Sequence, residues 1–222
     1  MKTNDRQLIE LMKEVDSGAA QLPDFQRGWV WDDGRIRSLI LSVIHNFPVG
    51  AAMFLEYGNE SIHFKHKPIE GSPADQTVEP DELILDGQQR LTSLYAVMKG
   101  KKVINSKFDE KSIIISYNPL QDKFEVGYQA TKKDPEWIYN ISDVYTTSSS
   151  YKVINSFIKR LSEYRECKGE VLTEAEQDTI SENINAIVNL KNHTLPVFDI
   201  KAHAEEEDVS EIFVRVTSGG VS

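Results

Sequence analysis

The sequence predicts a mixed α/β (α+β) protein. Short apolar runs typical of strands, such as Leu83-Ile84-Leu85, alternate with longer segments whose apolar residues recur at helical spacing, such as Ile36 to Ile44. The chain has 222 residues, enough to bury a substantial core, and its 40% hydrophobic and 27% charged residues are ordinary for a globular protein. We therefore expect one large domain or two small ones.

The elements of the first half follow from apolar spacing and from capping residues. Leu8, Leu11, Met12 and Val15 predict a helix over residues 4–17, with Gly18 as its C-cap. Pro23 favours an extended segment, after which Asp32 or Asp33 caps a helix that runs to Ile44. Strands are predicted over residues 51–56, 61–64 and 82–85. A helix over residues 88–99, closed by Gly100, follows the last of these strands.

The second half is predicted to be mainly helical. A β-hairpin is expected over residues 112–128, around Asn118-Pro119, and residues 129–150 are expected to be irregular. Helices are predicted over residues 151–166 and 173–191, a strand over 195–200, and a helix from Glu205 to Val216. We therefore expect an α/β core over 1–130, a helical subdomain over 131–192, and a return to the core over 193–222. The abrupt end of the chain predicts a further, C-terminal domain.

Charge and composition narrow the class of protein. The net charge of -10 argues against broad coating of nucleic acid, which depends on Lys and Arg contacts to phosphate. The single cysteine, Cys167, excludes an internal disulfide and a cysteine-rich zinc site. No apolar run approaches the roughly 20 residues of a membrane helix, and the polar start lacks a signal-peptide core. A cytoplasmic protein is therefore expected.

The most informative motif is Asp86-Gly87-Gln88-Gln89-Arg90, between a predicted strand and a predicted helix. A helix N-terminus presents unpaired N–H groups and the positive end of a dipole, so it favours a phosphate. Arg90 offers a fork of donors to phosphate oxygens, Gly87 allows a close approach of backbone, and Asp86 is a candidate ligand of a divalent cation. Gln88 and Gln89 are candidates to position a base, a ribose or a water. The alternative is a capped turn with Asp86 as N-cap.

Two further segments combine arginine with aromatic or glycine residues. In Phe25-Gln26-Arg27-Gly28-Trp29-Val30-Trp31, aromatic rings could stack on a base while Arg27 binds phosphate, or the tryptophans could be buried core residues. Near the C-terminus, Thr217-Ser218-Gly219-Gly220 after Arg215 could form an anion-binding nest, or a helix C-cap with a tail. The glycine, lysine and serine/threonine spacing of a P-loop is absent from the sequence.

Three motifs, in order, carry a resemblance to a known family. They are Leu22-Pro23-Asp24-Phe25-Gln26-Arg27 with Trp31, then Asp86-Gly87-Gln88-Gln89-Arg90-Leu91-Thr92, then Phe213-Val214-Arg215-Val216-Thr217-Ser218-Gly219-Gly220. With them, the chain resembles the ParB-like DGQQR family, found in GmrS-type subunits of modification-dependent (type IV) restriction systems. The helix that ends at Phe47-Pro48-Val49-Gly50 also matches. One departure is visible, because the family commonly has Asn where Thr217 or Ser218 falls.

The resemblance implies a ParB/sulfiredoxin-like α/β core with helical additions, and binding and hydrolysis of a nucleoside triphosphate. That activity would regulate DNA cleavage by a His-Asn-His nuclease domain or partner subunit, in defence against phage. Combined with the motifs, it predicts Asp86, Gln88, Gln89 and Arg90 as catalytic residues, with Mg²⁺ or another divalent cation on Asp86. The nucleotide-binding residues are then Gln26, Arg27, Trp31, Gly87, Arg215, Gly219 and Gly220.

The sequence also allows other functions. A regulatory module could sense nucleotide or DNA without hydrolysis. A ParB-like domain could bind or nick DNA directly through Arg27, Arg35 and Arg37, and a purely structural role would leave the three motifs unexplained. Homo-oligomerisation, the nucleotide preference and the DNA modification are not specified by the sequence.

Overall fold

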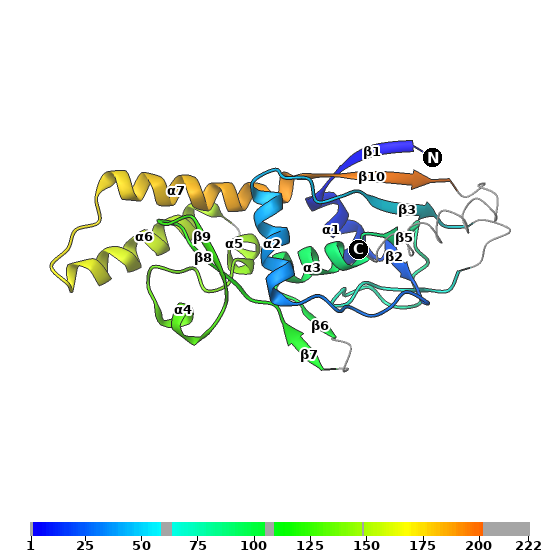
Figure 1. Ribbon diagram of the computed structural model, residues 1–222, viewed down its shortest axis with the longest axis horizontal. Coiled ribbons are helices and arrows are strands. Elements are labelled where there is room, and N and C mark those ends of the chain that lie inside the picture. Colours follow the sequence, from blue (N-terminus) through cyan, green and yellow to red (C-terminus); the bar gives the residue numbers. More distant parts are fainter. Residues whose placement is uncertain (1, 59–63, 105–108, 148, 202–222) are drawn as a thin grey trace.

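The computed structural model describes residues 2–58, 64–104, 109–147 and 149–201. The molecule is elongated. The part that contains the main sheet, here called the sheet part, lies at one end, and a mainly helical part lies at the other (Figure 1). The strands are β1 (Lys2–Gln7), β2 (Ala20–Pro23), β3 (Ala52–Glu56), β4 (His66–Lys67), β5 (Glu82–Asp86), β6 (Lys102–Ile104), β7 (Glu110–Ser112), β8 (Ile115–Asn118), β9 (Lys123–Val126) and β10 (Thr194–Ile200).

Single helices separate strands in the first half of the chain, and four successive helices precede the last strand. The helices are α1 (Leu8–Ser17), α2 (Asp33–Ile44), α3 (Gln88–Lys99), α4 (Gln129–Lys133), α5 (Ser142–Thr146), α6 (Ser150–Glu166), α7 (Glu174–Asn189) and the 3₁₀ turn η1 (Leu190–Asn192). The mixed α+β class predicted from the sequence is therefore confirmed. In the described part of the chain, no helix is long and apolar enough to span a bilayer.

The main sheet has six strands in the order β1-β10-β3-β5-β2-β4. The β10–β3 and β2–β5 pairs are parallel, whereas β1–β10, β3–β5 and β2–β4 are antiparallel. The strand predicted over 195–200 is thus β10, and it lies between β1 and β3. Two small sheets, β6–β7 and β8–β9, lie outside the main one, and β8–β9 is the predicted hairpin.

Alternation along the strands gives the sheet two apolar faces. Phe54 and Ile84 belong to the main core with the helices, whereas Leu55, Leu83 and Leu85 belong to a second, smaller cluster. Helix α3 lies deep in the main core, because its residues from Leu91 to Met98 are all buried. The sheet and α3 therefore form a firm support for the β5–α3 connection.

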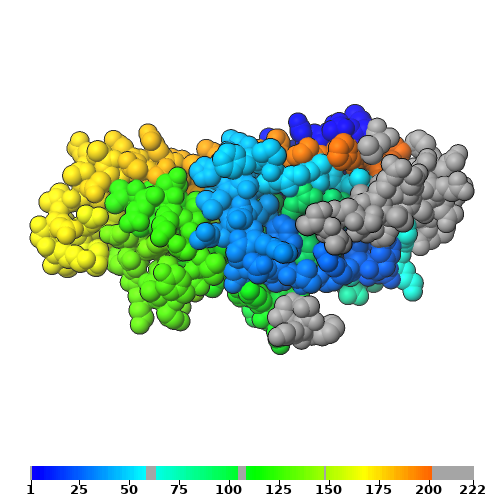
Figure 2. Space-filling model, in the orientation of Figure 1, coloured from blue at the N-terminus to red at the C-terminus, as the bar shows by residue number. Residues whose placement is uncertain are grey.

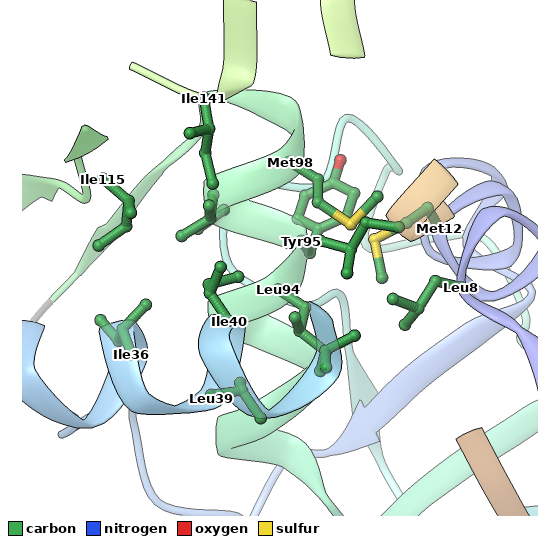
Figure 3. Close-up of a cluster of buried hydrophobic side chains, with 14 of the residues drawn as sticks. Leu8, Met12, Ile36, Leu39, Ile40, Leu94, Tyr95, Met98, Ile115 and Ile141 are labelled. Carbon is green, nitrogen blue, oxygen red and sulfur yellow. The ribbon is translucent and has the colours of Figure 1, made fainter. Parts of the chain in front are cut away.

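Figure 3 shows how the helices pack around α3. Side chains from α2, such as Ile40, lie against Leu94 and its neighbours, while Leu8 and Met12 of α1 lie near Tyr95. The predicted helices over 33–44 and 88–99 and the glycine caps Gly18 and Gly100 are confirmed. Close packing on all sides explains why α3 has so few exposed residues.

Two expectations for local structure are wrong. Residues 2–7 form a strand, not the start of the first helix, because they pair with β10 and because Arg6 binds Glu82 and Asp199. The region 129–150, expected to be irregular, contains α4, α5 and the start of α6. Most of the strand predicted over 61–64 and all of the last predicted helix lie outside the described residues.

The helical part continues the molecule away from the sheet. Thr173 and Glu176 form a capping box at the start of α7, and α7 packs against α6. In the space-filling view the atoms of the β8–β9 and α4 region lie between α2 and the α6–α7 connection (Figure 2). The sheet part and the helical part share one continuous main core. It includes Leu8 of α1 as well as Ile184 of α7.

Candidate functional site

The DGQQR motif forms the connection between β5 and α3. Asp86 ends the strand, Gly87 is the N-cap with a φ of +87°, and Gln88 begins the helix. A Cβ atom at Gly87 would lie 3.1 Å from the Cβ atom of Ala52 on β3, so both the backbone angle and the space favour glycine. The alternative in which Asp86 is the N-cap is wrong.

The N-terminus of α3 keeps its positive character. Among the described residues no side chain caps it, and its first turn contains no acidic residue. Unsatisfied N–H groups and the helix dipole give such an end a partial positive charge. This end of α3 is therefore suited electrostatically to an anion.

Both glutamines of the motif bind the backbone of the 24–31 segment. The Nε2 atom of Gln88 donates to the carbonyl oxygen of Arg27 at 2.7 Å. Gln89 accepts from the N–H of Val30 at 2.9 Å and donates to the carbonyl oxygen of Gly28 at 3.2 Å. Two motifs whose bonded residues are 61 apart in sequence thus lie side by side.

Gln26 fastens the same segment to the strand that carries the motif. Its Nε2 atom donates to the carbonyl oxygens of Ile84 and Leu85, at 2.8 and 2.9 Å. Lys67 on β4 adds bonds to the carbonyl oxygens of Asp24 and Gln26, at 3.0 and 2.7 Å. These amides and the ammonium are therefore committed to holding backbone.

Arg90 holds a third segment, the one that leads into β3. Its guanidinium donates to the carbonyl oxygens of Val49 and Ala51, at 2.6 and 2.9 Å. It also lies 3.3 Å from a carboxylate oxygen of Asp86, in an i,i+4 ion pair. Because the Arg90 side chain is only 20% exposed, most of its donors already have partners. We interpret Arg90 as a positioning residue in this state.

Two charged groups at the junction remain accessible. The Asp86 side chain is 46% exposed, and Arg27 is exposed. Within the described residues the Arg27 guanidinium makes no hydrogen bond or ion pair. Arg27, and Asp86 with the part of its carboxylate that Arg90 does not cover, are thus the charged groups accessible to a ligand at this place, which we call the Arg27–Asp86 junction.

The cavity below the junction is small. It has a volume of about 10 Å³ and is lined mainly by apolar side chains with Gly87 and Arg90. That is room for about one water molecule. A nucleotide at this place would lie on the outer face of the junction, between exposed groups, and not inside the fold.

The two tryptophans of the 24–31 segment differ in how deeply they are buried. Trp29 is 1% exposed, and its Nε1 atom donates to Ser93 Oγ of α3 at 3.0 Å. Trp31 is partly buried and packs against the same core. Trp29 is therefore a core residue, as the alternative interpretation held, and neither ring is fully exposed to a ligand.

Several candidate residues stand apart from the junction or outside the structure. Arg215, Gly219 and Gly220 lie outside the described residues. Arg35 pairs with Asp32, and Arg37 pairs with Glu125 at 3.1 Å. Of the three arginines considered for direct DNA contact, Arg27 alone keeps its guanidinium unpaired among the described residues.

The side chains at the junction determine what kind of metal ion could be held there. Among the described residues no group of three or more His, Cys, Asp or Glu side chains could hold one. Asp86 is a single, partly exposed carboxylate. Mg²⁺ is commonly bound by one or two carboxylates together with substrate phosphates and water. The donor set therefore fits an ion that arrives with a triphosphate, not a resident metal.

Two supporting residues were missed at the level of sequence. Lys67 ends β4, and Glu70 follows it and accepts from the backbone N–H groups of Trp29 and Ile104, at 3.3 and 2.6 Å. Their partners are backbone atoms, which leave no pattern in the sequence.

Comparison with known proteins agrees with the motifs. The family model described as the GmrSD restriction endonuclease N-terminal domain matches residues 8–222. An uncharacterized protein of Methanocaldococcus jannaschii is 33% identical over 135 residues, which cover 58% of this chain and 23% of that protein. Because the family model spans nearly the entire sequence, the chain belongs to the family of GmrSD restriction endonuclease N-terminal domains.

Proposed function

We propose that the chain binds and hydrolyses a nucleoside triphosphate at the Arg27–Asp86 junction and so regulates DNA cleavage in a phage-defence restriction system. The cleavage would be carried out elsewhere, by a nuclease domain or a partner subunit. The observation that carries the proposal is the pairing of two distant motifs at an uncapped helix N-terminus, with Arg27 and Asp86 left exposed. A merely structural turn would not need that arrangement.

Each group at the junction has a role in this proposal. The N–H groups of α3 and the guanidinium of Arg27 bind phosphate oxygens. Asp86 would hold Mg²⁺, which when bound neutralises charge on the phosphates. Gln26, Gln88 and Gln89 fix the 24–31 segment so that Arg27 is presented at the helix end. Positioning and charge neutralisation supply most of the rate in such reactions.

The test compares the two exposed charged residues of the junction with an exposed arginine outside it. We expect Arg27→Gln and Asp86→Asn to fold normally but to bind a non-hydrolysable triphosphate with Mg²⁺ at least roughly tenfold more weakly, since a charged hydrogen bond is worth about 1.5–3 kcal/mol. Arg35→Gln is the matched control, because Arg35 is similarly exposed but lies outside the junction. Calorimetric titration and phosphate release are measured on each. Equal affinity and turnover in all four proteins would overturn the proposal.

A second candidate is nucleotide sensing without hydrolysis. It is favoured by the commitment of Arg90 and both glutamines to backbone, which leaves few groups for chemistry. Binding that depends on Arg27 but gives no phosphate release, in the presence of DNA and of the nuclease, would establish this second function.

A further inference from the structure

A second cavity lies in the helical part, well away from the DGQQR motif. Residues of α4, of the connection to α5 and of α6 line it, and its volume is about 380 Å³. Figure 1 locates α4 and α6 on the side of the molecule away from the main sheet. The cavity, which we call the α4–α6 cavity, shares no lining residue with the Arg27–Asp86 junction. Its size is in the range of small-molecule sites, about 300–1,000 Å³.

Aromatic rings contribute to its walls. Trp137, Tyr139 and Phe157 all line it. Arg160 holds this wall in place, because it donates to the carbonyl oxygens of Pro135 and Trp137, at 3.3 and 3.0 Å. The Arg160 guanidinium also lies 5.0 Å from the centre of the Phe157 ring. The wall is therefore braced between α6 and the segment after α4.

Positive charge predominates at the same cavity. Lys132, Lys133, Lys152 and Arg160 line it, against the two carboxylates of Asp134 and Asp143. This local excess stands out in a chain whose net charge is -10. Lys132 lies 5.5 Å from the centre of the Tyr139 ring.

Two of these cations are available to a ligand. In the described part of the chain, Lys133 and Lys152 make no ion pair or side-chain hydrogen bond. Lys133 ends α4 and Lys152 lies in the first turn of α6, so they approach the cavity from different elements. A ligand with an anionic group would satisfy both.

We propose that the α4–α6 cavity binds a nucleotide, free or as part of a nucleic-acid strand. An aromatic base stacks on aromatic side chains such as Trp137, and its phosphate binds Lys133 and Lys152. Asp143 and Ser156 on the lining offer acceptors for the exocyclic and sugar donors of the same ligand. The site goes beyond the proposed hydrolysis at the junction and does not depend on it.

Tryptophan fluorescence tests the inference directly. The chain has three tryptophans, and replacing Trp137 with Phe identifies the part of the signal that arises in the cavity. We expect AMP, GMP, CMP or dTMP, or a short single-stranded DNA, to quench the wild type saturably and to quench Trp137→Phe much less. Saturation by a mononucleotide indicates a free nucleotide, and saturation by the DNA alone indicates a nucleotide within a strand; either supports the inference.

Lysine variants test the phosphate contacts. Lys133→Gln combined with Lys152→Gln should raise the midpoint of quenching roughly tenfold or more, as two charge-assisted contacts are lost. Lys159→Gln is the matched control, because Lys159 is exposed and lies two turns along α6 from Lys152 but outside the cavity. All of these lysines are exposed or at the surface, so melting curves should coincide.

A comparison with the junction separates the two proposals. Asp86→Asn should leave quenching of Trp137 unchanged whether or not the junction binds a triphosphate. Absence of saturable quenching with every probe overturns the inference. Quenching that survives in the double lysine variant but is lost in Asp86→Asn also overturns it, because the ligand then lies at the junction.

Discussion

Gly50 and Arg90 lie so close that a Cβ atom at position 50 would be 2.6 Å from the Nη1 atom of Arg90. Gly50 also has a φ of +81°, a region that other residues adopt at a cost. The guanidinium passes this glycine to reach the carbonyl oxygens on either side of it, those of Val49 and Ala51. Residue 50 therefore determines whether Arg90 can hold the start of β3.

Replacing Gly50 with alanine should destabilise the fold. The backbone strain alone costs about 1–3 kcal/mol, and contact with Arg90 adds to it. Gly169→Ala is the control, because Gly169 has a φ of +75° and a Cβ atom there would meet none of the described residues within 4 Å, so that it reports strain alone. Urea denaturation gives both free energies of unfolding. Equal losses in the two variants would show that the Arg90 contact has no energetic weight.

The buried hydrogen bond between Trp29 and Ser93 should be a strong link between the 24–31 segment and α3. Ser93→Ala leaves the indole N–H of Trp29 without its acceptor in the core, which costs about 1–3 kcal/mol. In a Trp29→Phe background the same change should cost much less, because the donor is already gone. A double-mutant cycle in urea measures the difference. Additive losses would contradict the expected coupling.

Ionisation of Asp16 should make the free energy of unfolding depend on pH in the acid range. Burial raises the pKa of its carboxyl group, but hydrogen bonds from Lys99 and Tyr95 outweigh burial, so the pKa lies below its ordinary value. The folded state then binds fewer protons than the unfolded state, and the stabilisation is lost as the pH falls through the folded pKa.

Asp16→Asn removes this titration. We expect the difference in free energy of unfolding between wild type and variant to be largest near neutral pH and to shrink below about pH 4. Denaturation by urea across this range measures the difference. A gap that stays constant with pH would mean that the carboxylate of Asp16 does not provide the link between α1 and α3.

The accuracy of the sequence predictions depended on how local the signals were. Helix α2 was predictable because its N-cap Asp32 and its buried residues Ile36, Leu39, Ile40 and Val43 are all within one segment. Strand β1 was not, because its residues are polar and it is stabilised by pairing with β10, almost the full chain away. Helices α4 and α5 have only five residues each, too few to show a helical period.

In the candidate site, too, local sequence signals predicted some features and not others. The positions of Asp86, Gly87 and the helix start could be predicted from the strand, the glycine and the apolar run that follows. The inward orientation of Gln88 and Arg90 could not, since their partners are backbone carbonyl groups, which any sequence supplies. The motif therefore predicted where the strand ends and the helix begins, but not which of its polar residues are exposed to solvent.

The last prediction concerns Gln89, which holds the 24–31 segment through both ends of its amide. Gln89→Ala should cost only about 1 kcal/mol of global stability, because the contact is near the surface. Exchange of the Val30 amide hydrogen should nevertheless accelerate, since that N–H loses its acceptor. Triphosphate affinity should fall as well, because Arg27 is then held less firmly.

Gln177→Ala separates this local effect from a general one. Gln177 is also in the first turn of a helix, and its side chain also donates to a backbone carbonyl, that of Leu172 at 3.2 Å. The two variants should lose similar global stability, but only Gln89→Ala should change Val30 exchange and nucleotide affinity. If Gln89→Ala binds triphosphate as tightly as Gln177→Ala does, then anchoring of the 24–31 segment does not contribute to the site.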